Sequence, residues 1–284
     1  MIPAAFEYHR PSDIASALAT LREFGDEARV IAGGHSLIPM MKLRMAAIGH
    51  LIDLQDIAGL KGIRIDGNSV TIGAMVTQQE LIGDAALTRA APLLRETALQ
   101  IADPQVRAVG TLGGNVANGD PGNDMPAVMQ CLDAAFTLVG PDGTREVRAR
   151  DFYEAAYVTA RSDDEILTGI RFEATGGGCA YEKQKRKIGD YATAAAAVTL
   201  QKAGTACTGA SIAMTNLSDV PVWSKAAGDA LVGSSCTAAD IGRAVAAALA
   251  DIAPTADNRG PVEFKRHVAG VILRRAIERA WALA

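Results

Sequence analysis

The sequence has few aromatic residues, no excess charge of one sign and no long hydrophobic run. Aromatic residues make up 5% of the 284 residues, and 28 lysines and arginines against 32 acidic residues give a net charge of −4. This near balance excludes a nucleic-acid binder that depends on positive charge and a disordered acidic chain. Apolar stretches such as Ala244–Ala250 are much shorter than the roughly 20 residues that span a bilayer. We therefore expect a soluble protein with no transmembrane segment and no nucleic-acid partner.

Cysteine and histidine are also scarce and dispersed. The four cysteines are Cys131, Cys179, Cys207 and Cys236, and no Cys-x-x-Cys pair or His-Glu-x-x-His motif occurs. An iron–sulfur cluster or structural zinc held by this chain alone is therefore not expected. Scattered cysteines suit a reducing cytoplasm, and the first ten residues have no basic or apolar region typical of an export signal. A redox role would require an organic cofactor.

The first 57 residues are predicted to form a small α/β unit with parallel strand pairing. Ser12 can cap a helix that ends at Gly25, and Val30–Ala32 and Leu51–Leu54 are typical of short buried strands.

Residues 58–175 are predicted to form a middle α+β domain. Alternating apolar residues around turn residues indicate two hairpins, and longer segments between them are helix-like. The expected elements are strands at 62–65, 70–72, 135–139, 145–147 and 166–172, and helices at 78–87 and 92–102.

The third domain is predicted over residues 178–284, after a linker at Gly176–Gly178. It is expected to contain a small antiparallel sheet followed by helices. The strands are expected at 181–187, 192–201 and 208–217, and the helices at 237–250 and 261–283.

Two glycine-rich loops are the strongest candidates for a binding site. The first runs through Ala32, Gly33, Gly34, His35, Ser36 and Leu37, and the second through Thr111, Leu112, Gly113, Gly114 and Asn115. Consecutive glycines allow backbone N–H groups to approach an anion, and hydroxyl and amide side chains add donors. Neither loop matches the Gly-x-Gly-x-x-Gly or P-loop patterns. Two such loops predict a clamp for a phosphate-bearing cofactor.

These loops resemble the paired pyrophosphate loops of the FAD-binding medium subunits of molybdenum hydroxylases. Further similar blocks are Ile101–Gln105, Asn118–Pro126 and Tyr181–Ala194, and the similarity covers essentially the whole chain. It is greatest to the branch that serves aerobic carbon monoxide dehydrogenases. The resemblance implies an α+β, vanillyl-alcohol-oxidase-type (PCMH-type) FAD-binding fold with a C-terminal α+β domain. FAD would lie between the first two domains.

The resemblance also implies partners. These are a large molybdopterin subunit and a small subunit with two [2Fe–2S] clusters, in a dimer of heterotrimers. The clusters would then lie outside this chain, in agreement with its lack of a cysteine motif. Electrons would pass from the clusters to FAD and on to an external acceptor such as a quinone. The implied location is the cytoplasm, with peripheral association at the inner face of the membrane as an option.

Site roles follow from the same resemblance. Both loops would hold the FAD pyrophosphate, and Asp124 would lie near the ribityl and adenosine hydroxyls, which a carboxylate accepts well. Asp190 and Tyr191 would lie beside the isoalloxazine, where an aromatic ring limits access to its N5 atom. Lys187 would favour reduced, anionic flavin, although a short basic run is more commonly a solvated edge. Ile188 and Gly189 stand where acidic residues occur in NAD-reducing relatives, which argues against an NAD-reducing role.

Three alternatives remain open from the sequence. One is the medium subunit of a hydroxylase for another substrate, such as an aldehyde, a xanthine or an N-heterocycle. Another is a freestanding flavin oxidase of the same fold. The third is a non-enzymatic nucleotide-binding or assembly protein. The sequence contains no acid–base pair or Ser–His–Asp arrangement, as expected of a chain that transfers electrons and leaves substrate chemistry to a partner.

Overall fold

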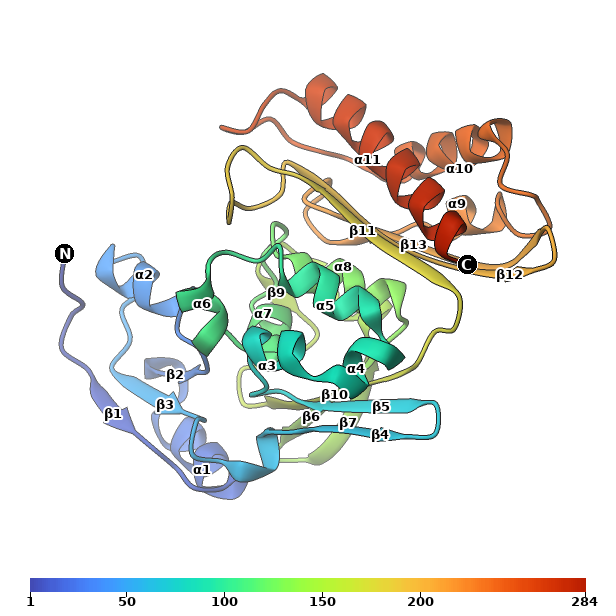
Figure 1. Ribbon diagram of the computed structural model, residues 1–284. Coiled ribbons are helices and arrows are strands. Elements are labelled where there is room, and N and C mark those ends of the chain that lie inside the picture. Colours follow the sequence, from blue (N-terminus) through green and yellow to red (C-terminus); the bar gives the residue numbers. More distant parts are fainter.

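The computed structural model describes residues 1–284 and begins with a three-stranded parallel sheet (Figure 1). Its strand order is β1 (Glu7–His9), β3 (His50–Asp53) and β2 (Ala28–Ile31). Helix α1 (Ile14–Phe24) packs on this sheet. The predicted helix and parallel strands are confirmed, whereas strand β1 was not predicted, because it is only three residues long and half-exposed.

The N-cap of helix α1 lies one residue after the predicted cap, Ser12. The Asp13 side chain accepts a 2.8 Å hydrogen bond from the Ser16 N–H, so Asp13 and not Ser12 is the N-cap. The carboxylate can take the same position as a serine hydroxyl, which makes the two neighbours hard to separate by sequence. Gly25 ends the helix with φ 49°, as predicted.

The middle part consists of a five-stranded antiparallel sheet covered by short helices. The strands, in spatial order, are β4 (Ile63–Asp66), β5 (Ser69–Gly73), β10 (Ile166–Glu173), β6 (Ala135–Gly140) and β7 (Gly143–Arg148). The helices are α3 (Gln78–Gly83), α4 (Ala85–Ala90), α5 (Pro92–Ala98), α6 (Pro104–Val109), α7 (Leu112–Ala117) and α8 (Asp124–Cys131). A small hairpin of β8 (Tyr153–Ala155) and β9 (Val158–Thr159) lies beside them, and α2 (Leu37–Lys42) follows β2.

The helical layer differs from its prediction in three places. The helix predicted at 78–87 is two helices, because the Asp84 side chain accepts from the Leu87 N–H at 2.7 Å and starts a new helix. The helix predicted at 92–102 ends at Ala98. The second glycine-rich segment is helix α7 and not an open loop, with the Thr111 hydroxyl capping it at the Gly114 N–H.

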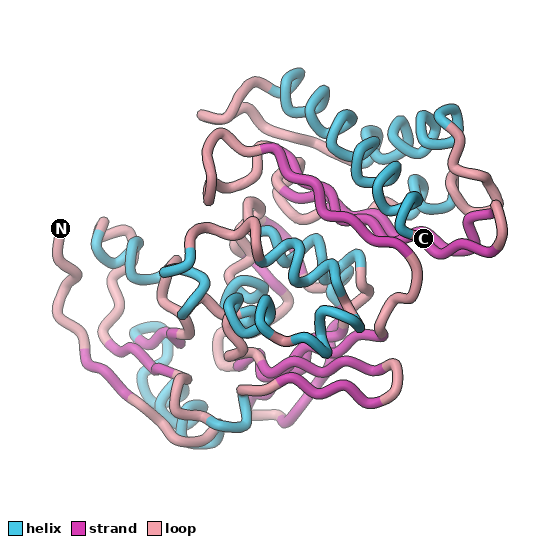
Figure 2. Tube along the Cα trace, viewed as in Figure 1, coloured by secondary structure: helices cyan, strands magenta, loops and turns pink.

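The C-terminal part consists of an antiparallel sheet and helices, as predicted, and its own helices pack on one face of the sheet (Figure 2). The sheet has four strands, one more than predicted. Its strands, in spatial order, are β11 (Gly178–Gln184), β12 (Ala194–Ala203), β13 (Ala206–Thr215) and β14 (Val222–Trp223). Its helices are α9 (Lys225–Asp229), α10 (Ala238–Asp251) and α11 (Val262–Leu283). β11 begins at Gly178, three residues before its prediction, and a Cβ at this position would overlap the Ala280 carbonyl of α11. This glycine therefore permits close packing of α11 on the sheet.

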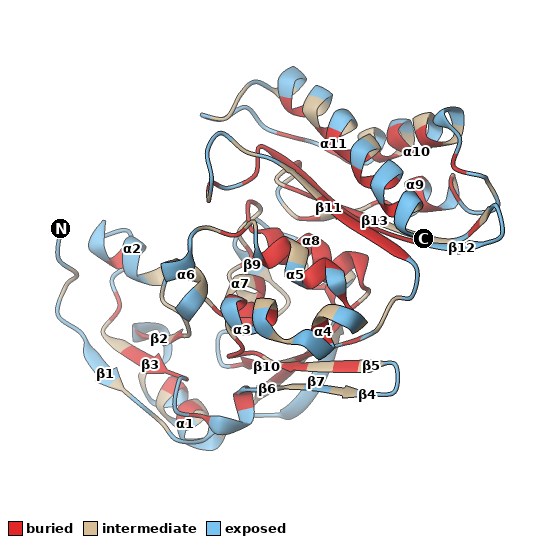
Figure 3. Cartoon of the chain, viewed as in Figure 1, coloured by how far each residue is buried: buried red, intermediate tan, exposed pale blue.

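Two main hydrophobic clusters share the C-terminal sheet. One lies between this sheet and the five-stranded sheet and includes helices α5 and α8, and the other lies beneath α10 and α11. The sheet is consequently buried on both faces along most of β12 (Figure 3). The molecule is thus layered as sheet, helices, sheet, helices, with the parallel N-terminal unit at one side (Figure 1). None of the helices, α11 included, combines the length and the apolar character needed to cross a membrane.

Candidate functional site

A cavity of about 470 Å³ lies where the three parts of the chain meet. Its lining comes from the β2–α2 loop, the start of α7, the start of α8, and the segment from β11 to Tyr191. Such a volume is in the range of small-molecule and cofactor sites, which are commonly found between domains. Both glycine-rich segments contribute to the same cavity, as the clamp hypothesis requires.

The β2–α2 loop presents a row of free backbone donors. The N–H groups of Gly33, Gly34, His35 and Ser36 have no hydrogen-bond partner within the chain. Gly34 has φ 72°, in the left-handed region, and Ser36, two residues later, is in the right-handed helical region with φ −97° and ψ −49°. Successive N–H groups in such a conformation form a concavity that binds anions. The loop is therefore suited to a phosphate.

The glycines of this loop serve two different purposes. Gly34 adopts the left-handed conformation, which side chains with a Cβ disfavour. Gly33 is required for close packing, because a Cβ there would overlap the Val109 carbonyl oxygen and come within 2.7 Å of the Gly110 Cα. Gly33 thus packs against the end of α6, directly before the second glycine-rich segment.

The second segment offers side chains more than backbone donors. The N–H groups of Leu112 and Gly113 already donate to Val76 and Ala74, at 2.8 and 2.9 Å. In contrast, the Asn115 Oδ1 atom is buried without a partner. The Gln78 Oε1 atom, also at the cavity, is buried and unpaired as well. Because buried polar atoms are nearly always hydrogen-bonded in folded proteins, these two acceptors indicate a polar ligand in the cavity.

Asp124 begins helix α8 and is held by two donors from β11. Its Oδ2 atom accepts from the Lys183 Nζ at 2.8 Å, and its Oδ1 atom accepts a short hydrogen bond from the Tyr181 hydroxyl. All three side chains are buried. Burial raises the pKa of Asp124 above its usual value, although Lys183 opposes this shift. Burial, and after it the neighbouring Asp124, raises the pKa of the Tyr181 hydroxyl well above its usual value. The carboxylate retains acceptor positions for ligand hydroxyls, since an ionised carboxylate has about four.

The Asp190–Tyr191 segment also lines the cavity, and the Tyr191 side chain is partly exposed to solvent. Asp190 accepts from the Arg186 Nε at 3.0 Å and lies 3.7 Å from Arg259. Burial alone would raise the pKa of Asp190, but these arginines hold it below its usual value. The Tyr191 ring packs on Gly122, where a Cβ would come within 2.9 Å of it, and the Arg259 guanidinium lies 5.7 Å from the ring centre. Burial, followed by nearby acidic groups, raises the pKa of Tyr191 to about 12.

The residues predicted for the site, with two exceptions, line this cavity. The lining ones are Ala32, Gly33, Gly34, His35, Ser36, Leu37, Thr111, Gly113, Gly114, Asn115, Asp124, Asp190 and Tyr191. The Leu112 side chain is fully buried in the core, and Lys187 is exposed and is not part of the lining. Lys183 and Gln78 line the cavity and were not predicted. The sequence around each of them has no feature that indicates a binding site. Lys183 is distinguished only by its tertiary pairing with Asp124, and Gln78 only by its buried, unpaired side-chain oxygen.

Comparisons with known proteins agree with this geometry. The family model "FAD binding domain in molybdopterin dehydrogenase" matches residues 4–175, and "CO dehydrogenase flavoprotein C-terminal domain" matches residues 179–280. The carbon monoxide dehydrogenase medium chain of Afipia carboxidovorans is 57% identical over 286 residues, with 100% of this chain and 99% of the relative covered. That of Hydrogenophaga pseudoflava is 44% identical, with 99% of each covered.

A solved structure is similar to this chain over its whole length. A chain of reconstituted CO dehydrogenase from Oligotropha carboxidovorans superimposes with a TM-score of 0.98 at 56% identity, and 100% of both chains is covered. The predicted α+β FAD-binding fold with its C-terminal domain is therefore confirmed, and so is FAD as the cofactor.

Proposed function

Since the chain belongs to the FAD-binding medium subunits of molybdenum hydroxylases, in the carbon monoxide dehydrogenase branch, we propose that it carries electrons out of such a complex. The partners are a large molybdopterin subunit and a small subunit with [2Fe–2S] clusters. Bound FAD supplies the redox chemistry, because flavins exchange electrons one or two at a time. The proposed acceptor is a quinone, met by a cytoplasmic complex at the inner face of the membrane. The substrate is oxidised on the large subunit.

One observation supports this assignment above the others. Four consecutive residues with unpaired N–H groups, Gly33 to Ser36, line the same cavity as Asn115, whose side-chain oxygen is buried and unpaired. A dinucleotide supplies both complements, a pyrophosphate for the N–H groups and N–H or O–H donors for the oxygen. The residues present thus fit FAD.

The division of labour among the residues follows from their positions. The β2–α2 loop and the Thr111–Asn115 segment would hold the pyrophosphate, with Ser36 and Thr111 adding hydroxyl donors. Asp124, braced by Lys183, would accept ligand hydroxyls. Tyr191 would cover the isoalloxazine and exclude water from it, and Asp190 would position Tyr191. Lys187, which is exposed, would act on the flavin only through its long-range positive charge.

The test is a single glycine substitution in the assembled complex. Gly33→Ala adds a Cβ that overlaps the Val109 carbonyl at the end of α6, so the β2–α2 loop must move away from the residues that lead into the Thr111–Asn115 segment, and FAD should be lost. We expect carbon monoxide to reduce the clusters of the FAD-free complex, observed by electron paramagnetic resonance, while reduction of an added quinone falls to background.

The matched control is Gly83→Ala, because a Cβ at Gly83 meets no atom within 4 Å. This variant should retain both FAD and quinone reduction. An FAD-free Gly33→Ala complex that reduces quinone at the normal rate would refute the proposed electron route. Full FAD retention in Gly33→Ala would refute the assigned pyrophosphate site and leave the electron route standing.

A further inference from the structure

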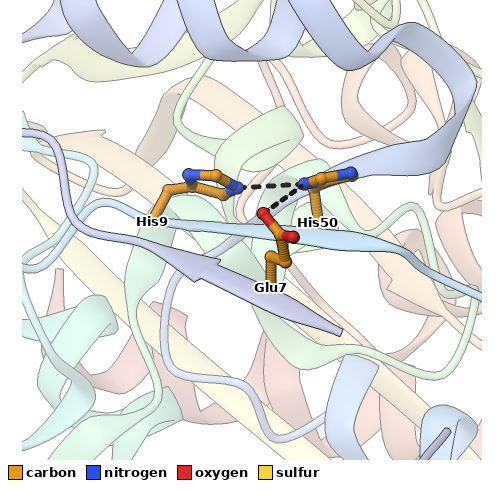
Figure 4. A group of neighbouring side chains, drawn as sticks. All are labelled: Glu7, His9 and His50. Carbon is orange, nitrogen blue, oxygen red and sulfur yellow. Dashed lines mark hydrogen bonds and ion pairs between the residues drawn. The ribbon is translucent and has the colours of Figure 1, made fainter. Parts of the chain in front are cut away.

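Three potential metal ligands meet at the edge of the N-terminal sheet (Figure 4). Glu7 and His9 lie two residues apart on β1, so both side chains leave the same face of the strand. His50 is the first residue of β3 and pairs with Glu7 in the parallel ladder, which places it on that face too. Tyr8 leaves the opposite face, where its hydroxyl donates to Asp53. The strand register itself therefore brings the three side chains together.

The distances within this cluster suit coordination of a single ion. The His9 Nε2 and His50 Nδ1 atoms are 3.0 Å apart. Two nitrogens bound at about 2.0–2.1 Å to one metal are about 2.9–3.4 Å apart when the angle between them is about 90–110°. The Glu7 Oε2 atom lies 3.8 Å from His50 Nδ1, and the Glu7 side chain is 74% exposed and free to move closer. One potential ligand atom from each residue lies within 4.8 Å of the other two.

The surroundings fix the orientation of one of the two rings. The Phe24 ring, at the end of α1, stacks on His50 with a centroid distance of 3.6 Å and an angle of 11° between the planes. His9 lies beside the same pair at 5.3 Å from His50 and 5.4 Å from Phe24. Both imidazoles are half-buried. A ligand ring that is already oriented loses less side-chain entropy on binding.

We propose that Glu7, His9 and His50 form a binding site for a late first-row divalent metal ion such as Zn²⁺. Two imidazoles and one carboxylate form a ligand set that suits Zn²⁺ and its neighbours and not Mg²⁺ or Ca²⁺, which prefer oxygen ligands. Water would complete the coordination, because Glu7 is exposed to solvent. None of the three residues lines the cavity described above, so the metal site is separate from the proposed flavin site.

The consequence is structural. A bound ion would connect β1 to β3 through side chains, in addition to the three paired positions of their ladder. Because binding only the folded state stabilises it by mass action, the ion should anchor the N-terminal strand. Without metal, the two histidines are joined by one hydrogen bond, in which one ring donates and the other accepts.

The experiment uses the untagged, FAD-loaded full-length chain after treatment with a chelator. Calorimetric titration with Zn²⁺ should give one ion per chain, and Co²⁺ should give a visible absorption band that reports imidazole coordination. His9→Gln and His50→Gln should each weaken Zn²⁺ binding at least about tenfold, as loss of a ligand requires. The melting temperature of the wild-type chain should rise with Zn²⁺ concentration, and that of the variants should not.

His267→Gln is the matched control, because His267 is an exposed histidine on α11 outside this cluster. It should bind Zn²⁺ as the wild type does. Glu7→Gln changes an exposed side chain and should fold normally and bind several-fold more weakly, so it tests the site even if a histidine variant misfolds. No saturable binding by the wild type, or unchanged affinity in Glu7→Gln together with the folded histidine variants, would overturn the proposal.

Discussion

Tyr191 is a half-exposed aromatic residue whose ring contacts two other segments of the chain. Gly122 leaves room for its ring, and Arg259 lies near the ring centre. Its backbone N–H donates to the Asp190 carboxylate at 2.9 Å, so the two residues are positioned together. An aromatic ring at the mouth of a cofactor cavity controls access of solvent and acceptor more than it contributes to binding the distant phosphates.

Replacing Tyr191 should therefore separate flavin access from flavin affinity. In Tyr191→Ala we expect the rate of flavin reoxidation by a soluble quinone to change at least about fivefold, whereas the FAD dissociation constant changes less than about threefold, since one exposed contact contributes of order 0.5 kcal/mol. Stopped-flow absorbance and equilibrium dialysis measure the two quantities. A large loss of FAD affinity with normal reoxidation would contradict the assigned position.

Tyr191→Phe serves as the control and tests the ionisation of the hydroxyl. Because burial and acidic neighbours raise the pKa of Tyr191 to about 12, the phenol is protonated at every pH from 6 to 10. The pH profile of reoxidation in Tyr191→Phe should therefore follow that of the wild type over this range. Since the folded pKa lies above the usual value, any stabilisation from this hydroxyl is present at neutral pH and is lost only as the pH rises towards 12.

At the scale of single elements, strand β12 shows why four consecutive alanines occur at its start. Ala195 and Ala197 face the cluster shared with α5 and α8, whereas Ala194 and Ala196 face the cluster beneath α10 and α11. A central strand covered by packed elements on both faces allows little volume at each position. Small side chains thus let helices approach the sheet closely on both sides.

Enlarging one of these alanines should destabilise the fold without affecting the site. In Ala196→Leu, three added carbon atoms must fit under α11, and overpacking of a core typically costs about 1–3 kcal/mol. We expect a lower midpoint of urea unfolding and unchanged FAD content per folded chain. Ala203→Leu, on the exposed end of the same strand, should unfold at the wild-type midpoint. Equal midpoints for both variants would show that packing on both faces of β12 does not restrict side-chain size at Ala196.

The predictability of an element depends on whether its signal is local. The strands β4 to β7 and β10 to β13 and the helices α10 and α11 follow from apolar alternation or periodicity and from clear turn residues, whereas the short hairpin of β8 and β9 was not predicted. The break between α3 and α4 was missed because Asp84 ends one helix and caps the next, and a helix-like pattern continues across it. Helix α7 was missed because glycines at 113 and 114 suggest a loop, whereas both are needed there to pack against Ala74 and Thr111. Tertiary packing overrides propensity at such points.

At the scale of the whole molecule, the cavity is assembled from segments far apart in the sequence. The β2–α2 loop, the α7 segment and the Asp190–Tyr191 segment each come from a different part of the fold. The first two have a glycine pattern that indicates an anion site, and the third became a candidate only through resemblance to a family. Lys183 was missed because its importance lies in one contact with Asp124, and residues 59 positions apart show no such pairing in a single sequence.

A chain of ion pairs connects the C-terminal helix to the mouth of this cavity. Lys265, in the first turns of α11, pairs with Asp257 at 2.9 Å, and Asp257 pairs with Arg259 at 3.5 Å. Arg259 in turn reaches Asp190 at 3.7 Å and covers Tyr191 at 5.7 Å. Because Lys265 and Arg259 are largely buried, water screens these pairs less than exposed ones. The C-terminal layer therefore helps to hold Asp190 and Tyr191, the residues proposed to lie beside the flavin, in place.

Arg259→Ala should consequently weaken the positioning of Asp190 and Tyr191 at the cavity without disturbing the hydrophobic core. We expect the FAD dissociation rate, followed by the rise in flavin fluorescence on dilution, to increase about two- to tenfold, since the contacts of Arg259 with Asp190 and Tyr191 together contribute of order 1 kcal/mol. Arg243→Ala removes an exposed arginine that pairs with Asp240 on α10 and should leave the rate unchanged. If Arg259→Ala and Arg243→Ala release FAD at the same rate, the C-terminal layer does not brace the cavity. If only Arg259→Ala releases it faster, the retention of a cofactor depends on a residue that lies more than 60 positions beyond Tyr191 in the sequence.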